Sequence, residues 1–231
     1  MIKVVFMDLD DTLLSFSGYV KEAMREGFAH FGLKEYEPWM YGIFEEINDG
    51  LWARIEQGTL TREGLWKIRW NMVFSRLGIA FDGEVFEKYF RGRLKNSAIP
   101  EPGAREILDY LAGRYSVCIV SNGPYEQQMN RLRAGKMDGY FSHCFISSQV
   151  GAQKPDPAFF DYCFAALRSA GFPDLAPEET VIVGDSVRAD IAGGRRYGMR
   201  TCLYRAPDNK TGEDGGADAV ISHLSELKKI L

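Results

Sequence analysis

Three aspartates follow directly on an apolar run at the beginning of the sequence. The chain starts MIKVVFMDLDDTLL, which sets Asp8, Asp10 and Asp11 immediately after residues 4–7. Carboxylates this close together repel one another, and the proton affinity of at least one rises unless a cation lies nearby. Packing gives no reason for such a cluster. We therefore interpret it as part of a site that needs a compensating cation.

Further polar residues stand where later apolar runs end. The carboxyl ends of parallel strands meet at one edge of a sheet, and open α/β sheets bind their ligands at that edge. If the apolar runs are parallel strands, all of these residues converge. They are Ser121, Asn122 and Gly123 after one run, Lys154 in GAQKPDP, and the carboxylates of GDSVRAD, which include Asp185 and Asp190.

This combination of residue types favours the chemistry of a phosphoryl group. Mg²⁺ prefers oxygen ligands and often joins one or two carboxylates to a substrate phosphate. An ion held by Asp8 and Asp185, together with Lys154, would compensate the acidic charge. Ser121 and the backbone amides at 122–123 could then hold phosphate oxygens.

The apolar runs themselves predict the elements that must position these residues. Strands are expected at residues 4–7, 116–121, 144–147, 180–185, 201–204 and 218–222, separated after residue 116 by amphipathic helical segments. Asp156 before Pro157 is typical of a helix start. The alternation predicts an α/β fold, a doubly wound parallel sheet with helices on both faces.

The segment between the first two strands has helical periodicity and almost no strand signal. Trp66, Trp70, Val73 and Leu77, for example, fall at i, i+4, i+7 and i+11. We expect an all-helical domain at 16–96, inserted into a core formed by 1–15 and 97–231. We interpret its aromatic residues Trp39, Tyr41, Trp52, Trp66 and Trp70 as core, and Arg54, Arg62 and Arg69 as solvated helix charges.

Composition excludes several classes of function. The 231 residues carry a formal net charge of -4, so a nucleic acid polymer is not an expected partner. No apolar run is long enough to span a membrane, and no signal peptide pattern is present, which favours the cytoplasm. Four widely spaced cysteines are expected to be reduced, and three isolated histidines argue against zinc.

Four motifs in order resemble those of the haloacid dehalogenase superfamily of aspartate-nucleophile phosphohydrolases. The resemblance covers about two thirds of the chain and implies a Rossmann-like core, a helical cap inserted between the first and second motifs, and Mg²⁺ as cofactor. The motifs are DLDDT (8–12), the strand-terminal Ser121, Lys154 before Pro155, and GDSVRAD (184–190).

The resemblance also implies a role for each matching residue. Asp8 would attack phosphorus and become an aspartyl-phosphate, and Asp10 would act as general acid and base. Thr12 would steady the first loop. Ser121 would hold a phosphate oxygen, and Lys154 would stabilise both Asp8 and the transferring group.

The metal would be held by Asp8, by Asp185 and by the backbone carbonyl of Asp10. Asp190 would orient Lys154 or a metal-bound water, and Ser186 would assist. Asp11 has no role in this chemistry and is expected to stabilise its loop. The expected phosphate-binding set is Thr12, Ser121, Asn122, Gly123 and Lys154.

The preferred hypothesis is a Mg²⁺-dependent phosphatase for a small phosphorylated metabolite, acting as a monomer or homodimer. LWARIEQGTLTREGLWKIRW with FSRLGI, and IVSNGPYEQQ, are similar to the branch of pyrimidine 5'-nucleotidases and N-acylneuraminate-9-phosphatase. A nucleoside 5'-monophosphate is therefore the leading substrate, and a sugar phosphate is an alternative. A 2-haloacid dehalogenase is disfavoured by Asp10, because a leaving halide needs no proton. A phospho-acceptor domain or a non-catalytic phosphate-binding protein is the alternative of another class.

Overall fold

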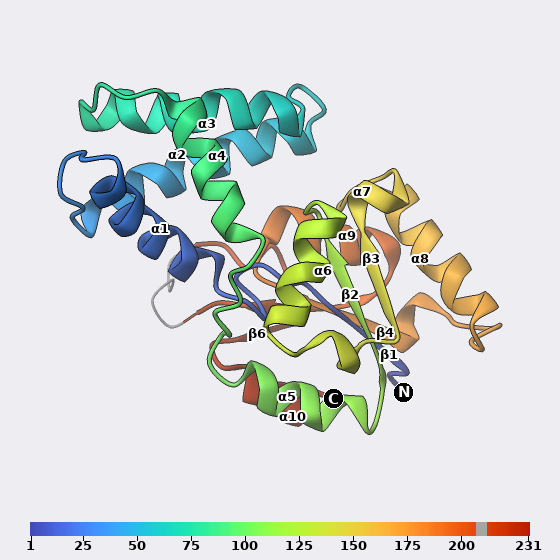
Figure 1. Cartoon of the computed structure of the whole chain (residues 1–231). Helices are drawn as coiled ribbons and strands as arrows, with labels where there is room; N and C mark the ends of the chain where they lie inside the picture. The colour runs from blue at the N-terminus through green and yellow to red at the C-terminus, as the bar shows by residue number, and fades with distance from the viewer. Residues whose placement is uncertain (207–211) are drawn as a thin grey trace. The chain divides into compact units, whose positions relative to one another are not determined.

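The computed structural model describes residues 1–206 and 212–231, and these form a six-stranded parallel sheet flanked by helices (Figure 1). The order β3-β2-β1-β4-β5-β6 places β1 between β2 and β4, with parallel pairing throughout. The chain moves outward from β1 to β3 and then returns to the other side of β1. The strands are β1 (Val4–Met7), β2 (Ser116–Ser121), β3 (His143–Ile146), β4 (Thr180–Gly184), β5 (Arg200–Tyr204) and β6 (Ala219–Ile221).

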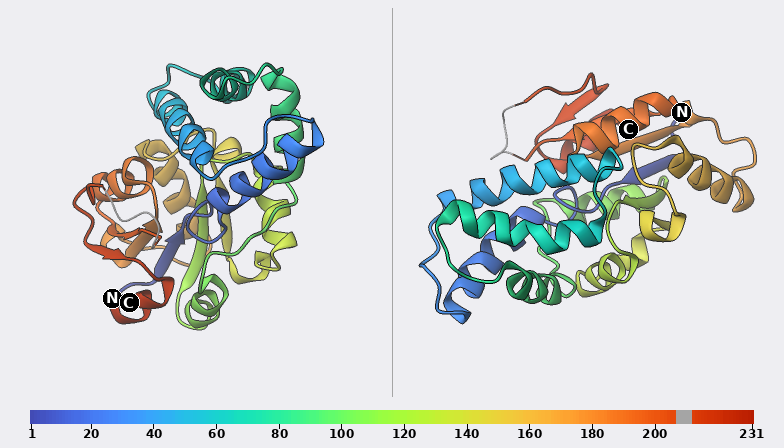
Figure 2. Two further views of the ribbon diagram at one scale, coloured as in Figure 1. Left: turned by 90° about the vertical axis from the view of Figure 1, so that its left-hand side faces the viewer. Right: turned by 90° about the horizontal axis from the view of Figure 1, so that it is seen from above.

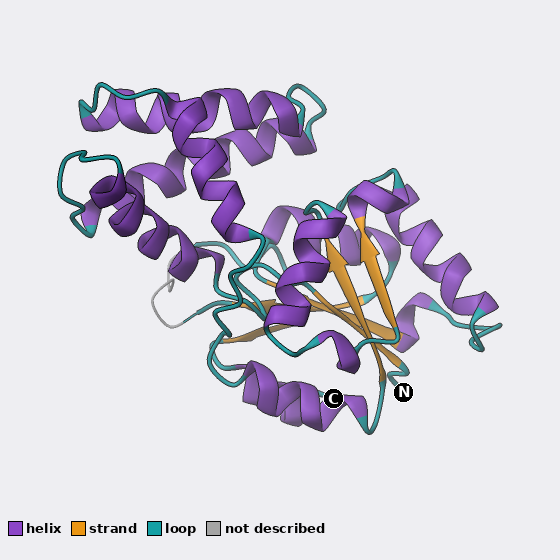
Figure 3. Ribbon diagram, in the orientation of Figure 1, coloured by secondary structure: helices purple, strands orange, loops and turns teal. Residues whose placement is uncertain are grey.

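Helices cover both faces of this sheet, as the strand and helix colours of Figure 3 make clear. Val5 and Met7 of β1 share one apolar core with α5, α6 and α10, while Val4 and Phe6 share another with α8. Both faces of β1 are therefore buried, as the apolar run predicted. The helices of this unit are α5 (Ala104–Ala112), α6 (Tyr125–Ala134), α7 (Ser147–Val150), α8 (Pro157–Ser169), α9 (Ala192–Tyr197) and α10 (Leu227–Ile230), with short turns η1 (Asp138–Tyr140), η2 (Pro177–Glu179), η3 (Val187–Ile191) and η4 (Leu224–Glu226).

The chain divides into two compact units, one formed by Met1–Ser15 with Ala98–Leu231 and the other by Phe16–Ser97. The second unit contains four helices among its described residues, and no strand. The predicted fold class, a parallel α/β sheet with an all-helical insert, is confirmed. The four helices are α1 (Phe16–His30), α2 (Trp39–Glu56), α3 (Arg62–Leu77) and α4 (Gly83–Leu94).

An aromatic core holds the helical unit together. Trp70 of α3 is buried and lies against Phe44, Phe86 and Phe90, with ring centroids 4.3–5.3 Å apart. The interpretation of the aromatics as core is correct for Trp70. It is wrong for Trp39, the first residue of α2, which is 52% exposed.

Arg69 also departs from its expected place on a solvated face. Its side chain is buried and forms two hydrogen bonds with the carboxylate of Glu87, at 3.1 and 2.7 Å. It donates a third to Asn48, at 2.9 Å. The periodicity of α3 could not reveal this, because the partners come from α2 and α4.

The two segments that connect to the helical insert are joined at the sheet unit. Leu14 pairs with Pro100, and the Ser15 amide donates to Ile99 at 2.8 Å. The loop after β1 closes on the same segment, since the Asp11 amide donates to Leu14 at 2.8 Å. Asp11 adopts a left-handed backbone conformation with φ of 54°, which Asp tolerates better than most residues. It thus shapes the loop that carries Asp8 and Asp10.

Both termini lie at the edge of the sheet where the strands begin. Met1 precedes β1, and the Tyr115 hydroxyl just before β2 donates to the carbonyl of Leu231 at 2.9 Å. The views of Figures 1 and 2 agree that the two ends of the chain are close together. No helix in the described part of the chain is long and apolar enough to cross a membrane.

Candidate active site

A buried lysine lies at the centre of the carboxylate cluster. Lys154 is 2% exposed, and its Nζ atom lies 2.6 Å from Asp8 Oδ1 and 2.6 Å from Asp190 Oδ1. The same ammonium donates to the carbonyl of Val120 at 2.8 Å. Its three N–H groups are thereby matched by three acceptors, which come from the residue after β1, from β2 and from η3. The ammonium therefore ties together three segments of the sheet edge.

The sheet order explains why these segments meet. Asp8 follows β1, and its amide donates to the carbonyl of Val183 in β4 at 2.9 Å. Because the chain reverses direction across the sheet at β1, a crevice for ligands is expected at the carboxyl ends of β1 and its neighbours. Asp8 and Asp185 stand at the ends of the adjacent strands β1 and β4.

Asn122 holds the loop that carries Lys154. Its side-chain amide donates to the Lys154 carbonyl at 2.8 Å, and its oxygen accepts from the Lys154 amide at 2.9 Å. The sequence placed Asn122 in the phosphate-binding set, but its side chain is occupied by these two bonds. Only its backbone amide is left for the predicted contact.

Asp190 is fixed by the turn of π-helix at η3. Its Oδ1 accepts from Lys154, and its Oδ2 accepts from the Ser186 amide at 3.1 Å. The Ser186 hydroxyl begins the turn by accepting from the Ala189 amide at 3.1 Å. A Cβ atom at Gly184 would stand 2.1 Å from Asp190 Oδ2, so only glycine allows this close approach.

Asp185 completes the acidic group. One ligand atom from each of Asp8, Asp185 and Asp190 can lie within 4.8 Å of the others. Asp185 itself is exposed, whereas Asp8 and Asp190 are buried. Loss of hydration where its carboxylate faces the protein, followed by the charges of Asp8, Asp11 and Asp190, raises the pKa of Asp185 well above its usual value.

The pKa values of Asp8 and Lys154 are shifted by the same burial and neighbouring charges. Burial raises the pKa of Asp8 to about 7, with the charges of Asp190 and Asp10 adding to the effect and Lys154 opposing it. Burial alone would lower the pKa of Lys154, but Asp190 and Asp8 outweigh it, and the pKa is raised. The ammonium stays charged while the carboxylates compete for further positive charge.

This donor set fits a hard divalent cation. Asp190 already has both oxygens engaged by Lys154 and Ser186, whereas Lys154 contacts Asp8 through its Oδ1 atom. All candidate ligands are oxygen atoms, which suits Mg²⁺.

Asp10 is held by two residues that sequence reasoning did not identify. Gln128 Nε2 donates to Asp10 Oδ2 at 2.6 Å, and the Arg131 guanidinium forms an ion pair with Asp10 Oδ1. Both partners are buried on α6. The signal was their i, i+3 spacing on the helix that follows Ser121, but polar residues at this spacing also occur on solvated helices.

The remaining predicted residues lie at the same edge. Ser121 is buried and its hydroxyl accepts from the Gly123 amide at 3.2 Å. Thr12 is fully buried, and its hydroxyl has no hydrogen-bond partner among the described residues.

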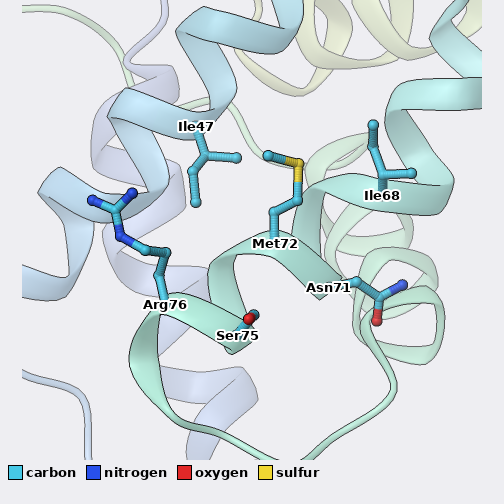
Figure 4. Close-up of a pocket in the computed structure, with 6 residues that line it drawn as sticks. All are labelled: Ile47, Ile68, Asn71, Met72, Ser75 and Arg76. Carbon is cyan, nitrogen blue, oxygen red and sulfur yellow. The ribbon is translucent and has the colours of Figure 1, made fainter.

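The helical unit has a groove of its own between α2 and α3, with a volume of about 550 Å³ (Figure 4). None of the predicted site residues lines it. We therefore base the functional site on the carboxylate cluster. The groove is lined by Ile47, Ile68, Asn71, Met72, Ser75 and Arg76.

Comparison with known proteins agrees with this geometry. The family model of the haloacid dehalogenase-like hydrolases matches residues 2–198. The chain belongs to the haloacid dehalogenase-like hydrolases. The hydrolase YfnB of Bacillus subtilis is 31% identical over 90% of this chain and 86% of its own length. The crystal structure of YfnB bound to magnesium matches with a TM-score of 0.87, covering 100% of this chain and 98% of that one.

Two other relatives of this haloacid dehalogenase-like hydrolase have named activities. The pyrimidine 5'-nucleotidase YjjG of Escherichia coli is 28% identical over 98% of this chain and 96% of its own length. The pyrimidine 5'-nucleotidase PynA of Streptococcus pneumoniae is 30% identical over 87% of this chain and 83% of its own length. The predicted family is confirmed, and the protein is an enzyme of this hydrolase family.

Proposed function

We propose that the protein is a Mg²⁺-dependent phosphomonoesterase that acts through an aspartyl-phosphate on Asp8. The observation that carries the proposal is the Lys154 ammonium, 2.6 Å from both Asp8 and Asp190 beside the carboxylate of Asp185. A site that gathers a fixed ammonium and surplus carboxylates is suited to a cation and to the negative charge of a phosphoryl group.

Asp8, Asp185 and the backbone carbonyl of Asp10 would hold the ion. When bound, Mg²⁺ supplies positive charge that neutralises the equatorial oxygens of the transferring phosphoryl group. Lys154 supplies further positive charge to the same group. Ser121 and the backbone amides at 122–123 bind its remaining oxygens.

Asp8 and Asp10 carry out the covalent chemistry in two steps. An oxygen of Asp8 forms a bond to phosphorus while the bond from phosphorus to the ester oxygen breaks, and Asp10 gives its proton to the departing alkoxide. Asp10 then removes a proton from water, whose oxygen attacks phosphorus. The bond to Asp8 breaks, and inorganic phosphate leaves.

Nucleoside 5'-monophosphates are the leading substrates. The names of YjjG and PynA support this class, because both are pyrimidine 5'-nucleotidases and each aligns over most of its length. A phosphatase for glyceraldehyde 3-phosphate from Pyrococcus furiosus is 28% identical, so a sugar phosphate is the alternative within the same chemistry.

The test is hydrolysis of p-nitrophenyl phosphate, uridine 5'-monophosphate and a hexose phosphate, each with Mg²⁺ and with a chelator. We expect metal-dependent turnover, with the nucleotide preferred. Asp8→Asn should lower kcat by about 10³-fold or more, since it removes the nucleophile. Asp11→Asn is the matched control, because Asn also tolerates the left-handed backbone at this position, and it should retain most activity.

Three results would contradict parts of the proposal. Full turnover in chelator excludes the Mg²⁺ requirement, and turnover of the hexose phosphate alone excludes the nucleotide class. Release of chloride from 2-chloropropionate without phosphate release would identify a dehalogenase instead.

A further inference from the structure

A four-residue network joins the acid–base carboxylate to the phosphate-binding hydroxyl. Gln128 Nε2 lies 2.6 Å from Asp10 Oδ2 and 2.9 Å from Ser121 Oγ. Arg131 Nη1 pairs with Asp10 Oδ1 and lies 3.1 Å from Gln128 Oε1. The two helix residues therefore contact each other as well as both groups of the site.

The orientation of the Gln128 amide follows from its neighbours. A guanidinium can only donate hydrogen bonds, so the side of the amide that faces Arg131 must be its oxygen. A carboxylate can only accept, so the side that faces Asp10 must be the NH₂ group. This is the arrangement in the structure. Arg131 thus determines which way Gln128 points.

The same orientation determines the direction of the Ser121 proton. A serine hydroxyl has two acceptor lone pairs and one proton. Ser121 Oγ accepts from Gln128 Nε2 at 2.9 Å and from the Gly123 amide at 3.2 Å. With both lone pairs occupied, its proton is left to donate, which is the polarity needed to bind an anionic phosphate oxygen.

The network is buried where it meets the helix and open where it meets the site. Gln128 is fully buried and Arg131 is 1% exposed, whereas a third of the Asp10 side chain reaches solvent. A Cβ atom at Gly123 would stand 2.5 Å from Gln128 Nε2, so the turn after β2 leaves room for this amide.

We propose that Gln128 and Arg131 are positioning residues for catalysis. Arg131 and Gln128 fix the carboxylate of Asp10 for proton transfer, and Gln128 also directs the Ser121 hydroxyl as a donor. The inference rests on the proposed role of Asp10 as general acid and base. Gln128 and Arg131 lie outside the four sequence motifs, so the inference assigns a role in the reaction to two further residues.

The test compares two esters that differ in their need for an acid. Departure of p-nitrophenolate needs little protonation, whereas departure of the alkoxide of β-glycerophosphate needs a proton. The ratio of kcat/KM for the aryl ester to kcat/KM for the alkyl ester therefore reports on Asp10. Arg131→Met and Gln128→Met should raise this ratio by about tenfold or more, towards the ratio of Asp10→Asn. Arg131→Lys should give a ratio between that of the wild type and that of Arg131→Met. Arg133→Met, the same change at an exposed position of α6, should leave it unchanged.

A merely structural role would lower both values of kcat/KM together. An unchanged ratio in Arg131→Met and Gln128→Met, beside a raised ratio in Asp10→Asn, overturns the inference and leaves the proposed function intact. An unchanged ratio in Asp10→Asn, or a wild type that hydrolyses neither ester, overturns the proposed function and the inference with it. If Arg131→Met does not fold, Gln128→Met and Arg131→Lys provide the same comparison.

Discussion

At the scale of single residues, the site depends on a buried ammonium that has an acceptor for each of its protons. Lys154 reaches Asp8, Asp190 and the Val120 carbonyl only because its backbone is held in place. Asn122 provides that restraint through two hydrogen bonds to the Lys154 backbone.

This geometry predicts the effect of replacing Asn122 with alanine. The loss of both hydrogen bonds should lower the free energy of unfolding by about 1–3 kcal/mol. It should also lower kcat, because Lys154 is then less well placed against Asp8. Urea unfolding and steady-state kinetics measure the two effects. A variant with raised KM but unchanged kcat and stability would show that Asn122 serves phosphate binding alone.

Some residues of the candidate site could be predicted from the sequence, and others were found only in the structure. Asp8, Ser121 and Asp185 were predicted, because each stands at the end of a strand and has a chemical type that restricts its use. Lys154 was predicted too, although it lies in the loop after α7 and not at a strand end. Gln128 and Arg131 were not, since no chemistry demands Gln or Arg on a helix. Their role follows only from contacts made between residues more than 100 positions apart, such as Asp10 with Arg131.

At the scale of elements, the helical unit is organised around a buried ion pair between α3 and α4. Arg69 and Glu87 are both nearly inaccessible, with side chains 5% and 4% exposed. Burial raises the pKa of Glu87, and the charge of Arg69 opposes the rise. The Arg69 guanidinium also lies over the ring of Phe90, 4.9 Å from its centroid.

Removing one partner of this pair should be costly. We expect Arg69→Met to lower the free energy of unfolding by about 3–5 kcal/mol, because it leaves the Glu87 carboxylate buried without its counter-charge. The double variant Arg69→Met/Glu87→Leu should recover much of that loss. Chemical denaturation of the single and double variants measures the coupling.

The matched control is the exposed pair between Arg76 and Glu46, which also joins α3 to another helix. Its side chains are 54% and 66% exposed, and its N to O distance is 3.0 Å. Arg76→Met should cost less than about 1 kcal/mol. Equal losses at Arg69 and Arg76 would contradict the importance of burial.

At the scale of the whole molecule, we expect the carboxylate cluster to couple folding to pH and to metal binding. The pKa of Asp8 rises from 3.8 in an unperturbed chain to about 7 in the metal-free fold. The folded protein then binds this proton more tightly than the unfolded chain does. The resulting stabilisation is complete below pH 3.8 and is lost as the pH rises to about 7. The raised pKa of Asp185 acts in the same direction.

Mg²⁺ should reverse this loss, because it binds the deprotonated carboxylates. We expect the difference in Tm between Mg²⁺-loaded and metal-free protein to widen from pH 5 to pH 8, reaching roughly 5 °C. Differential scanning calorimetry at fixed ionic strength provides the measurement. Asp185→Asn should reduce the difference at every pH, and a difference that does not depend on pH in the wild type would refute the linkage.

The sequence by itself determined the class of fold, and it predicted most of the residues to which the proposed chemistry assigns a role. Short continuous apolar runs indicated the strands, and a period of 3.6 residues indicated the helices. Asp156, for example, accepts from the Ala158 amide at 2.9 Å and begins α8, as its position before proline predicted. These are local properties, so neighbouring residues suffice to encode them.

Tertiary structure alone decided which side chains meet. It paired Asp10 with Arg131, occupied the Asn122 side chain with the Lys154 backbone, and buried Arg69 against Glu87. It also left Trp39 exposed, although its residue type favours burial. Each outcome depends on the approach of elements distant in the chain, and on the need of every buried polar group for a partner. No pattern within a single element carries that information.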